Sequence, residues 1–397
     1  MGKSDTFLRR PSRMEPNLAK RGPSQTSTKS TSHFGLTNQP TRLSLMTESI
    51  HRSYYGSRAY SPGKTLRQAP ALKSLPILSG ATRLPWSSTQ GTVPIELMMS
   101  HTPESMRFWQ KAQVDKIRQK ADKTYVPAKF ESVDLHQKYD QERFRFAQLP
   151  FQTQLWLFMQ QGGKWSFIIL LPMFLLVSFL GINKPAGSAF TLYVNNVIET
   201  FPILMGPWLA FWIIGHVVIN YFPRVWFRPP KGPLWELNRR TGLVTIFGYK
   251  RHRKEGVIDE FIAPFYEFDA YMITTHDRHG SYYGLLLQHR YEEQRINFHA
   301  LLGPDDFQQR PCALWDFLQN YMDTSGPIPD IPLFEPYRHL DPVTARYDQQ
   351  RGRNPRYWID MDDATFKTEV GAMWQRVYAI DTFSRPNLMA RYVDYGV

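Results

Sequence analysis

The chain has 397 residues, with 48 lysines and arginines against 35 acidic residues, and a single cysteine. That length allows two or three domains. The lone cysteine, Cys312, excludes an internal disulfide framework and a cysteine-rich zinc site. Most of the excess positive charge lies in residues 1–100, which carry +10, whereas the other 297 residues carry +3. The folded part is therefore not expected to have the basic face of a nucleic-acid-binding module.

Residues 1–100 are rich in serine, threonine and proline, and show no sustained period of 2 or 3.6 residues. Such a segment buries too little apolar surface to offset its ordering entropy, so we expect a disordered basic tail. One alternative stays open. Translation could begin at Met98 or Met99, because sequence with an ordered pattern follows almost at once.

Residues 101–160 are expected to form a helical juxtamembrane segment. Thr102 suits a helix N-cap, Pro103 suits the first helical position and Glu104 suits the first turn. The apolar residues that follow make only a ragged stripe among many charged ones. We therefore predict a solvated helix to about Lys123, which docks on the folded domain or on a membrane surface.

Two uncharged apolar runs occupy residues 165–183 and 203–222. As helices rising 1.5 Å per residue, both would come close to the thickness of the hydrocarbon layer, about 30 Å. The sequence thus predicts a transmembrane hairpin with a short outer loop over residues 184–202. Lysines and arginines flank the hairpin on both sides and are nearly missing from the loop. This asymmetry predicts a multi-pass protein of the bacterial inner membrane with both termini in the cytoplasm.

The lipid bilayer is therefore the first predicted partner, and an oligomer of identical chains through the spans is a further expectation. His216 lies inside the second apolar run. Polar groups at membrane depth are costly and often functional, so His216 is a candidate intramembrane residue. We favour an interhelical hydrogen bond over a proton or ion role, because two helices alone cannot enclose a pathway.

Residues 234–397 are predicted to form a cytoplasmic α+β domain, with strands first and helices after. A closing helix is expected to begin at Pro304-Asp305-Asp306. The expected strands are a hairpin that turns at Gly242, an extended stretch from Phe261 to Thr275, and a pair over Ser281 to Arg290 and Gln294 to Leu302. This order of elements is similar to that of bacterial pleckstrin-homology-like membrane proteins, which implies a fold and no function.

The acidic run Asp360-Met-Asp-Asp363, with Asp341 and Asp348 before it, is weighed as a metal site. It shows no fixed ligand spacing and has arginines beside it, so ion pairing and helix capping are favoured. Asp362 or Asp363 is expected to cap the last long helix.

Two further groups receive plain structural interpretations. His276 and His279 fall on a predicted turn, where exposure is favoured over a metal site, and Cys312 is expected to pack in the closing helix. The sequence contains no GxSxG, Walker A, GxGxxG or HExxH pattern. We therefore predict no catalytic residue, no cofactor and no metal.

Arginines and aromatic residues gather in the last third of the chain, and such residues dominate the hot spots of protein interfaces. We predict that they form a docking face for a protein partner; the alternative is that the tyrosines pack in the core and the arginines cover them. The candidate face comprises Arg338, Asp341, Arg346, Arg353, Tyr357, Trp358 and Asp360.

Three motifs resemble an uncharacterised family of proteobacterial proteins: Leu234-Trp-Glu-Leu-Asn-Arg-Arg-Thr-Gly242, Pro336-Tyr-Arg-His-Leu-Asp-Pro342 and Arg356-Tyr-Trp-Ile-Asp-Met-Asp362. The resemblance implies two spans ahead of a cytosolic domain, and members often occur beside type VI secretion genes. We expect an inner-membrane-anchored, non-catalytic binding protein of the accessory or immunity type. The alternatives are a membrane-perturbing toxin that acts through its spans, and an enzyme that uses the Asp341 to Asp363 region.

Overall fold

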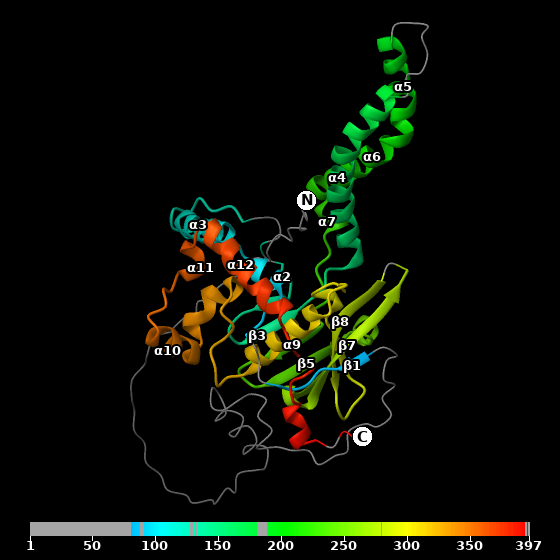
Figure 1. Cartoon of the computed structure of the whole chain (residues 1–397). Helices are drawn as coiled ribbons and strands as arrows, with labels where there is room; N and C mark the ends of the chain where they lie inside the picture. The colour runs from blue at the N-terminus through cyan, green and yellow to red at the C-terminus, as the bar shows by residue number, and fades with distance from the viewer. Residues whose placement is uncertain are drawn as a thin grey trace, which may run out of the picture. The chain divides into compact units, whose positions relative to one another are not determined.

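The structure is a computed structural model that describes residues 81–87, 91–127, 131, 133–180, 189–278, 280–393 and 395 (Figure 1). The first 80 residues of the predicted tail lie outside this range. The described residues fall into two compact units. The first, here called the α+β unit, takes in residues 81–132, 136–146 and 233–395. The second, the apolar helical unit, takes in residues 133–135 and 147–232.

The α+β unit contains two antiparallel sheets, which confirms the mixed fold class. The four-stranded sheet has the order β1 (Ala81–Arg83), β7 (Phe268–Asp277), β8 (Gly280–His289) and β9 (Arg295–Asn297). The five-stranded sheet has the order β2 (Lys138–Tyr139), β3 (Arg143–Phe146), β4 (Trp235–Asn238), β5 (Leu243–Gly248) and β6 (Asp259–Pro264).

Helices cover these sheets and complete the core. The buried helix α9 (Gln309–Met322) contacts both sheets, because its Phe317 meets Phe144 of β3 in the five-stranded sheet while the helix also packs against β7 and β8 of the four-stranded sheet. The remaining helices are α2 (Ile95–Met99), α3 (Pro103–Ala121), α8 (His252–Glu255), α10 (Pro342–Gln350), α11 (Tyr357–Asp360) and α12 (Asp363–Tyr378), with 3-10 turns at η2 (Phe265–Glu267), η3 (Phe298–Ala300), η4 (Pro332–Leu340) and η5 (Leu388–Arg391).

Local signals with a clear physical mechanism are confirmed. The β4–β5 hairpin turns at Gly242, whose φ of +70° suits a residue without a Cβ. Thr102 caps α3 by accepting a hydrogen bond from the Ser105 amide at 3.3 Å. Asp362, rather than Asp363, caps α12 by accepting from the Ala364 and Thr365 amides.

The sequence predicted one extended stretch from Phe261 to Thr275, but the structure divides these residues between two strands. Its first part ends β6 at Pro264, and its last part is β7, which belongs to the other sheet. Proline has no amide hydrogen and therefore ends the ladder, after which a single 3-10 turn redirects the chain.

The closing helix begins at Gln309 and not at residues 304–306. Asp305 instead exchanges backbone hydrogen bonds with Tyr283 of β8, at 2.7 and 3.2 Å. Phe307 therefore lies outside the helix, where its ring contacts Tyr378 of α12 with centroids 4.5 Å apart.

The predicted tail of residues 1–100 extends too far, because residues 81–87 and 91–100 belong to the fold. Leu84 and Trp86 are 0% and 3% exposed, and the Leu84 amide donates to the Ala270 carbonyl at 2.8 Å. These apolar residues pack individually against parts of the fold that are distant in the chain. Their own spacing therefore has no period that could have predicted them.

The segment 101–160 is also only partly helical. Helix α3 forms as expected and docks on the α+β unit, where Arg107 donates to the carbonyls of Ile359 and Met361. Residues 138–146, however, form β2 and β3. The alternation Arg143-Phe-Arg-Phe146 has the period of a half-buried strand, and both of its phenylalanines are at most 1% exposed.

Candidate functional site

The apolar helical unit contains α4 (Phe151–Leu180), α5 (Ala189–Leu204), α6 (Gly206–Tyr221) and α7 (Pro223–Trp226). Helix α4 is long and apolar enough to cross a membrane by itself. Helices α5 and α6 meet the same criterion only together, as a pair bent by 54°. By length and composition, the described residues thus hold one candidate span, or two if the bent pair counts as one.

The predicted boundaries of the hairpin need correction. Helix α4 begins at Phe151, well before the predicted start at residue 165, because the glutamine-rich stretch before the apolar run continues the same helix. The expected outer loop over residues 184–202 is helical from Ala189 onward. The second run, 203–222, contains the bend between α5 and α6 and is not one straight helix.

Two glycines bring α4 and α6 into close contact. A Cβ atom on Gly163 of α4 would lie 2.6 Å from the backbone nitrogen of Trp212, and one on Gly215 of α6 would lie 2.6 Å from the backbone nitrogen of Gln160. Both distances are shorter than any normal carbon contact. Small residues allow helix backbones to approach in this way, and in lipid such packing replaces the missing hydrophobic drive.

The hydrogen bonds described for His216 lie within α6 and do not link it to another helix, so the predicted interhelical bond stays a prediction. The partner of His216 is Asn220, one turn further along α6: the Asn220 amide donates to the His216 carbonyl at 2.8 Å and lies 3.2 Å from Nδ1. A polar bond between helices forms elsewhere, from the Asn196 amide to the Ser178 carbonyl at 3.4 Å. Asn220 thus contacts both the ring and the backbone of His216.

Along the chain, the apolar helices come between β3 and β4, two strands that are paired neighbours in one sheet. Strand β3 ends at Phe146, β4 begins at Trp235, and the two strands are antiparallel partners. The Leu234 amide donates to the Phe146 carbonyl at 2.8 Å. The chain therefore leaves the sheet and returns to it at the same strand end.

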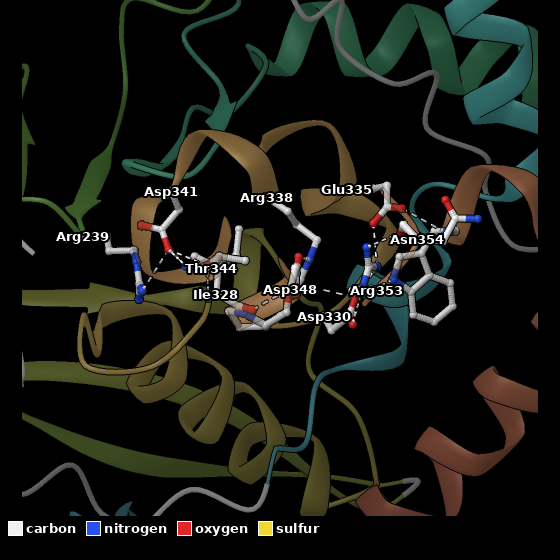
Figure 2. Close-up of polar contacts among 12 residues, drawn as sticks. Arg239, Ile328, Asp330, Glu335, Arg338, Asp341, Thr344, Asp348, Arg353 and Asn354 are labelled. Carbon is white, nitrogen blue, oxygen red and sulfur yellow. Dashed lines mark hydrogen bonds and ion pairs between the residues drawn. The ribbon is translucent and has the colours of Figure 1, made fainter. Parts of the chain in front are cut away.

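The candidate docking face is not a single surface. Arg338 is 3% exposed and makes a two-point ion pair with Asp348, at 2.8 and 2.7 Å (Figure 2). Asp341 is fully buried, where it caps α10 by accepting from the Thr344 amide at 3.0 Å and lies 3.7 Å from Arg239. Both residues hold the C-terminal segment together and neither is available to a partner.

A second set of contacts buries Trp358, which is 3% exposed. Its amide donates to Glu335 at 3.1 Å, and its indole donates to Asp330 at 2.8 Å. Arg353 bridges the same two acids, as Figure 2 shows. Burial raises the pKa of Glu335, and the hydrogen bond from Arg353 opposes that rise. The charges compensate one another, which lets Arg338 be buried and Arg353 lie half-buried.

The other candidates of this face remain at the surface. Arg346 is exposed, Tyr357 is 37% exposed, and Asp360 forms an exposed ion pair with Arg356 at 2.8 Å. The sequence did not indicate which arginines are buried, because the acids that neutralise them, Asp330 and Glu335 among them, do not stand beside them in the chain.

The remaining candidate groups have structural contacts. His276 is exposed at the β7–β8 turn, 2.9 Å from the Ser281 hydroxyl, and His279 lies outside the described residues. Cys312 is 1% exposed, and burial raises the pKa of its thiol to about 11. Within the described ranges, no three His, Cys, Asp or Glu side chains converge as a metal ion would require.

One feature escaped the sequence analysis. The connection between β5 and β6 contains the run Lys250-Arg-His-Arg-Lys254, whose lysines and arginines are exposed. The run itself is visible in the sequence. Its position at the strand end where the chain leaves the sheet for the apolar helices follows only from the strand register.

Comparisons with known protein families, with curated proteins and with solved structures found no match to this chain. The resemblance to the proteobacterial family therefore stays a prediction.

Proposed function

We propose that this protein is a membrane-anchored, non-catalytic binding protein. In this proposal α4 and the bent α5–α6 pair cross the bacterial inner membrane as a hairpin, and the α+β unit lies in the cytoplasm. The unit is proposed to have a pleckstrin-homology-like core, made of β3 to β6, β7 to β9 and the closing helix α9. The motif resemblance adds an accessory or immunity-type role beside type VI secretion.

The observation that carries the proposal is the junction between Phe146 and Leu234. A chain that leaves and re-enters one sheet at the same strand end must finish on the side of the membrane where it started. Such a segment crosses an even number of times, which favours two crossings over one. Backbone groups inside lipid must also be satisfied internally, which the helices of this segment achieve.

The acidic residues support a binding role over the enzyme alternative. Asp341 and Asp362 cap helices, Asp348 pairs with Arg338, and Asp360 pairs with Arg356. Carboxylates engaged in this way stabilise the fold. These contacts give the acids of the Asp341 to Asp363 region a structural role.

The insertion gives a direct test. Residues 147–233 are replaced by Gly-Asn-Gly, because short turns join adjacent antiparallel strands without strain. We expect the full chain to stay in membranes during alkaline carbonate extraction, and the shortened chain to be soluble, with a cooperative unfolding transition. A shortened chain that folds and still resists extraction would place the anchor elsewhere and contradict the proposal.

One observation favours the toxin alternative, namely the bend in the α5–α6 pair together with the exposed Glu199 on α5. A charged, broken helix can disturb a bilayer. Expression of the full and shortened chains, with growth and membrane potential recorded together, separates the two functions. Depolarisation by the full chain alone would support the toxin, whereas unchanged growth and potential would support the anchor.

A further inference from the structure

We propose that the β5–β6 connection, residues 249–258, is a binding site for the headgroups of anionic lipids. The inference rests on the proposed membrane anchoring and adds a second, lipid-selective contact to it. In this proposal the exposed bases of the connection bind lipid phosphates, and the apolar pair that follows them enters the interfacial layer.

The strand register fixes the end of the sheet at which this connection lies. Ile246 of β5 pairs with Trp235 of β4, which in turn pairs with Phe146, the last residue of β3. The chain continues from there into the connection, which closes with the pair Gly248–Asp259. The connection thus emerges at the strand end where the chain departs for the apolar helices and returns from them.

Two hydrogen bonds tie the connection to the return point. The Tyr249 hydroxyl donates to the Pro233 carbonyl at 2.7 Å, and the Phe247 amide donates to the Leu234 carbonyl at 3.0 Å. On the outgoing side, four residues separate Phe146 from the start of α4. Phe146 and Phe151 are therefore five Cα–Cα steps apart, at most about 18 Å of extended chain, so covalent connectivity alone limits how far from this strand end α4 can begin.

The helices that the chain enters and leaves at this strand end have exposed aromatic residues at their near termini. Phe151, the first residue of α4, is 79% exposed, and Tyr221, the last residue of α6, is 73% exposed. An aromatic pair at the ends of apolar helices is typical of the membrane–water interface. The lipid headgroups are therefore expected at the level of the β5–β6 connection.

The charges of the connection match an anionic surface. Lys250, Arg253 and Lys254 are exposed. The acids Glu255 and Asp259 are both paired with Arg251, at 3.5 and 3.1 Å, which offsets one of their two negative charges and closes the loop. Glu260 of β6 is also exposed.

An exposed apolar pair follows the bases directly. Val257 is 43% exposed and Ile258 is 37% exposed, just after Gly256, whose φ of +69° ends the short helix α8. Bases next to exposed aliphatic side chains form the combination that peripheral membrane segments use. A nucleic acid would bind the lysines and arginines of the connection but would leave these aliphatic side chains in water.

A fluorescence measurement on the full chain tests the proposal. With Cys312→Ser as background, Val257→Cys is labelled with bimane, and the protein is reconstituted in nanodiscs that contain nitroxide lipids. The discs are made of phosphatidylcholine alone or of phosphatidylcholine mixed with phosphatidylglycerol. We expect about threefold stronger quenching in the anionic discs, and a weaker effect at high salt.

Matched variants define the cause. Lys250→Gln, Arg253→Gln and Lys254→Gln together should reduce quenching in anionic discs to the neutral level. Removing three exposed bases of α3 instead, at Lys111, Arg118 and Lys120, should leave quenching unchanged. A bimane label at Thr241→Cys, in the turn at the opposite end of β4 and β5, should stay unquenched.

Several outcomes would overturn the inference. An unquenched label at residue 257, equal quenching in both kinds of disc, or the same loss with the α3 variant would each exclude a lipid-selective site in this connection. A chain that fails to enter the discs at all would overturn the proposed anchoring as well, which distinguishes that failure from failure of the lipid site alone.

Discussion

Replacing Trp86 by alanine should destabilise the α+β unit by about 3–5 kcal/mol, the usual cost of removing a large buried aromatic side chain. Trp86 is 3% exposed and lies in the segment whose composition predicts a tail. Its ring meets Trp315 of α9 and Phe265 edge to face, with centroids 4.7 and 5.3 Å apart. Its indole also donates to the Phe268 carbonyl at 3.2 Å, and losing that bond contributes about 1 kcal/mol of the total.

Pulse proteolysis of the purified protein in increasing urea measures this loss, and Trp109→Ala is the matched control. Trp109 lies on α3 and is 36% exposed, so the same change there should cost well under about 1 kcal/mol. Equal effects of the two substitutions would refute the placement of Trp86 in the core. The large effect would also argue against translation from Met98 or Met99, because such a chain lacks Leu84 and Trp86.

Three further predictions follow from the packing and burial of single residues. Gly215→Leu should lower stability in detergent by about 1–3 kcal/mol, because its Cβ would meet the α4 backbone. Gly206→Ala should change stability little, because a Cβ there would lie 4.0 Å from the Phe201 carbonyl oxygen. A thermal melt compares the two variants. Burial lowers the pKa of His101 to about 4, below the value near 6.5 of an unfolded chain, so stability should fall as pH drops from about 6.5 to 4; His101→Gln should flatten this part of the urea-midpoint profile. Because burial raises the pKa of Cys312 to about 11, only about 0.1% is thiolate at pH 8, and maleimide should react in urea but not before unfolding.

The parts of the fold that the sequence predicted correctly are those with a local cause. Gly242 was identified because its turn needs a positive φ, and Thr102 and Asp362 because a side-chain oxygen there satisfies free amide groups of a helix. These signals act within a few residues, so a single sequence contains them in full.

The missed features depend on residues far apart in the chain. Strand β3 pairs with β4, although the whole apolar segment separates them in the chain. The sequence therefore predicted that the α+β domain begins only after the spans, at residue 234. Leu84 and Trp86 have no period of their own; both are buried, and Trp86 packs against Phe265 and Trp315.

Part of the candidate docking face, including Arg338 and Asp341, is buried for a related reason. Exposure was inferred from residue type, and arginines are usually at the surface. Arg338 is buried all the same, because Asp348 neutralises it and the Ile328 carbonyl accepts a further hydrogen bond at 3.3 Å. Which charged residues are paired in this way is set by the tertiary fold.

The central claim is that the apolar segment leaves and re-enters one folded unit on one side of the membrane. Accessibility to a membrane-impermeant maleimide tests it most directly, with single cysteines at Gln119 on α3, Gln350 at the end of α10, and Ser188 between α4 and α5, all in the Cys312→Ser background. In intact spheroplasts we expect labelling at position 188 alone, and at positions 119 and 350 only after permeabilisation. Labelling of 119 and 350 from opposite sides of the membrane would contradict the claim.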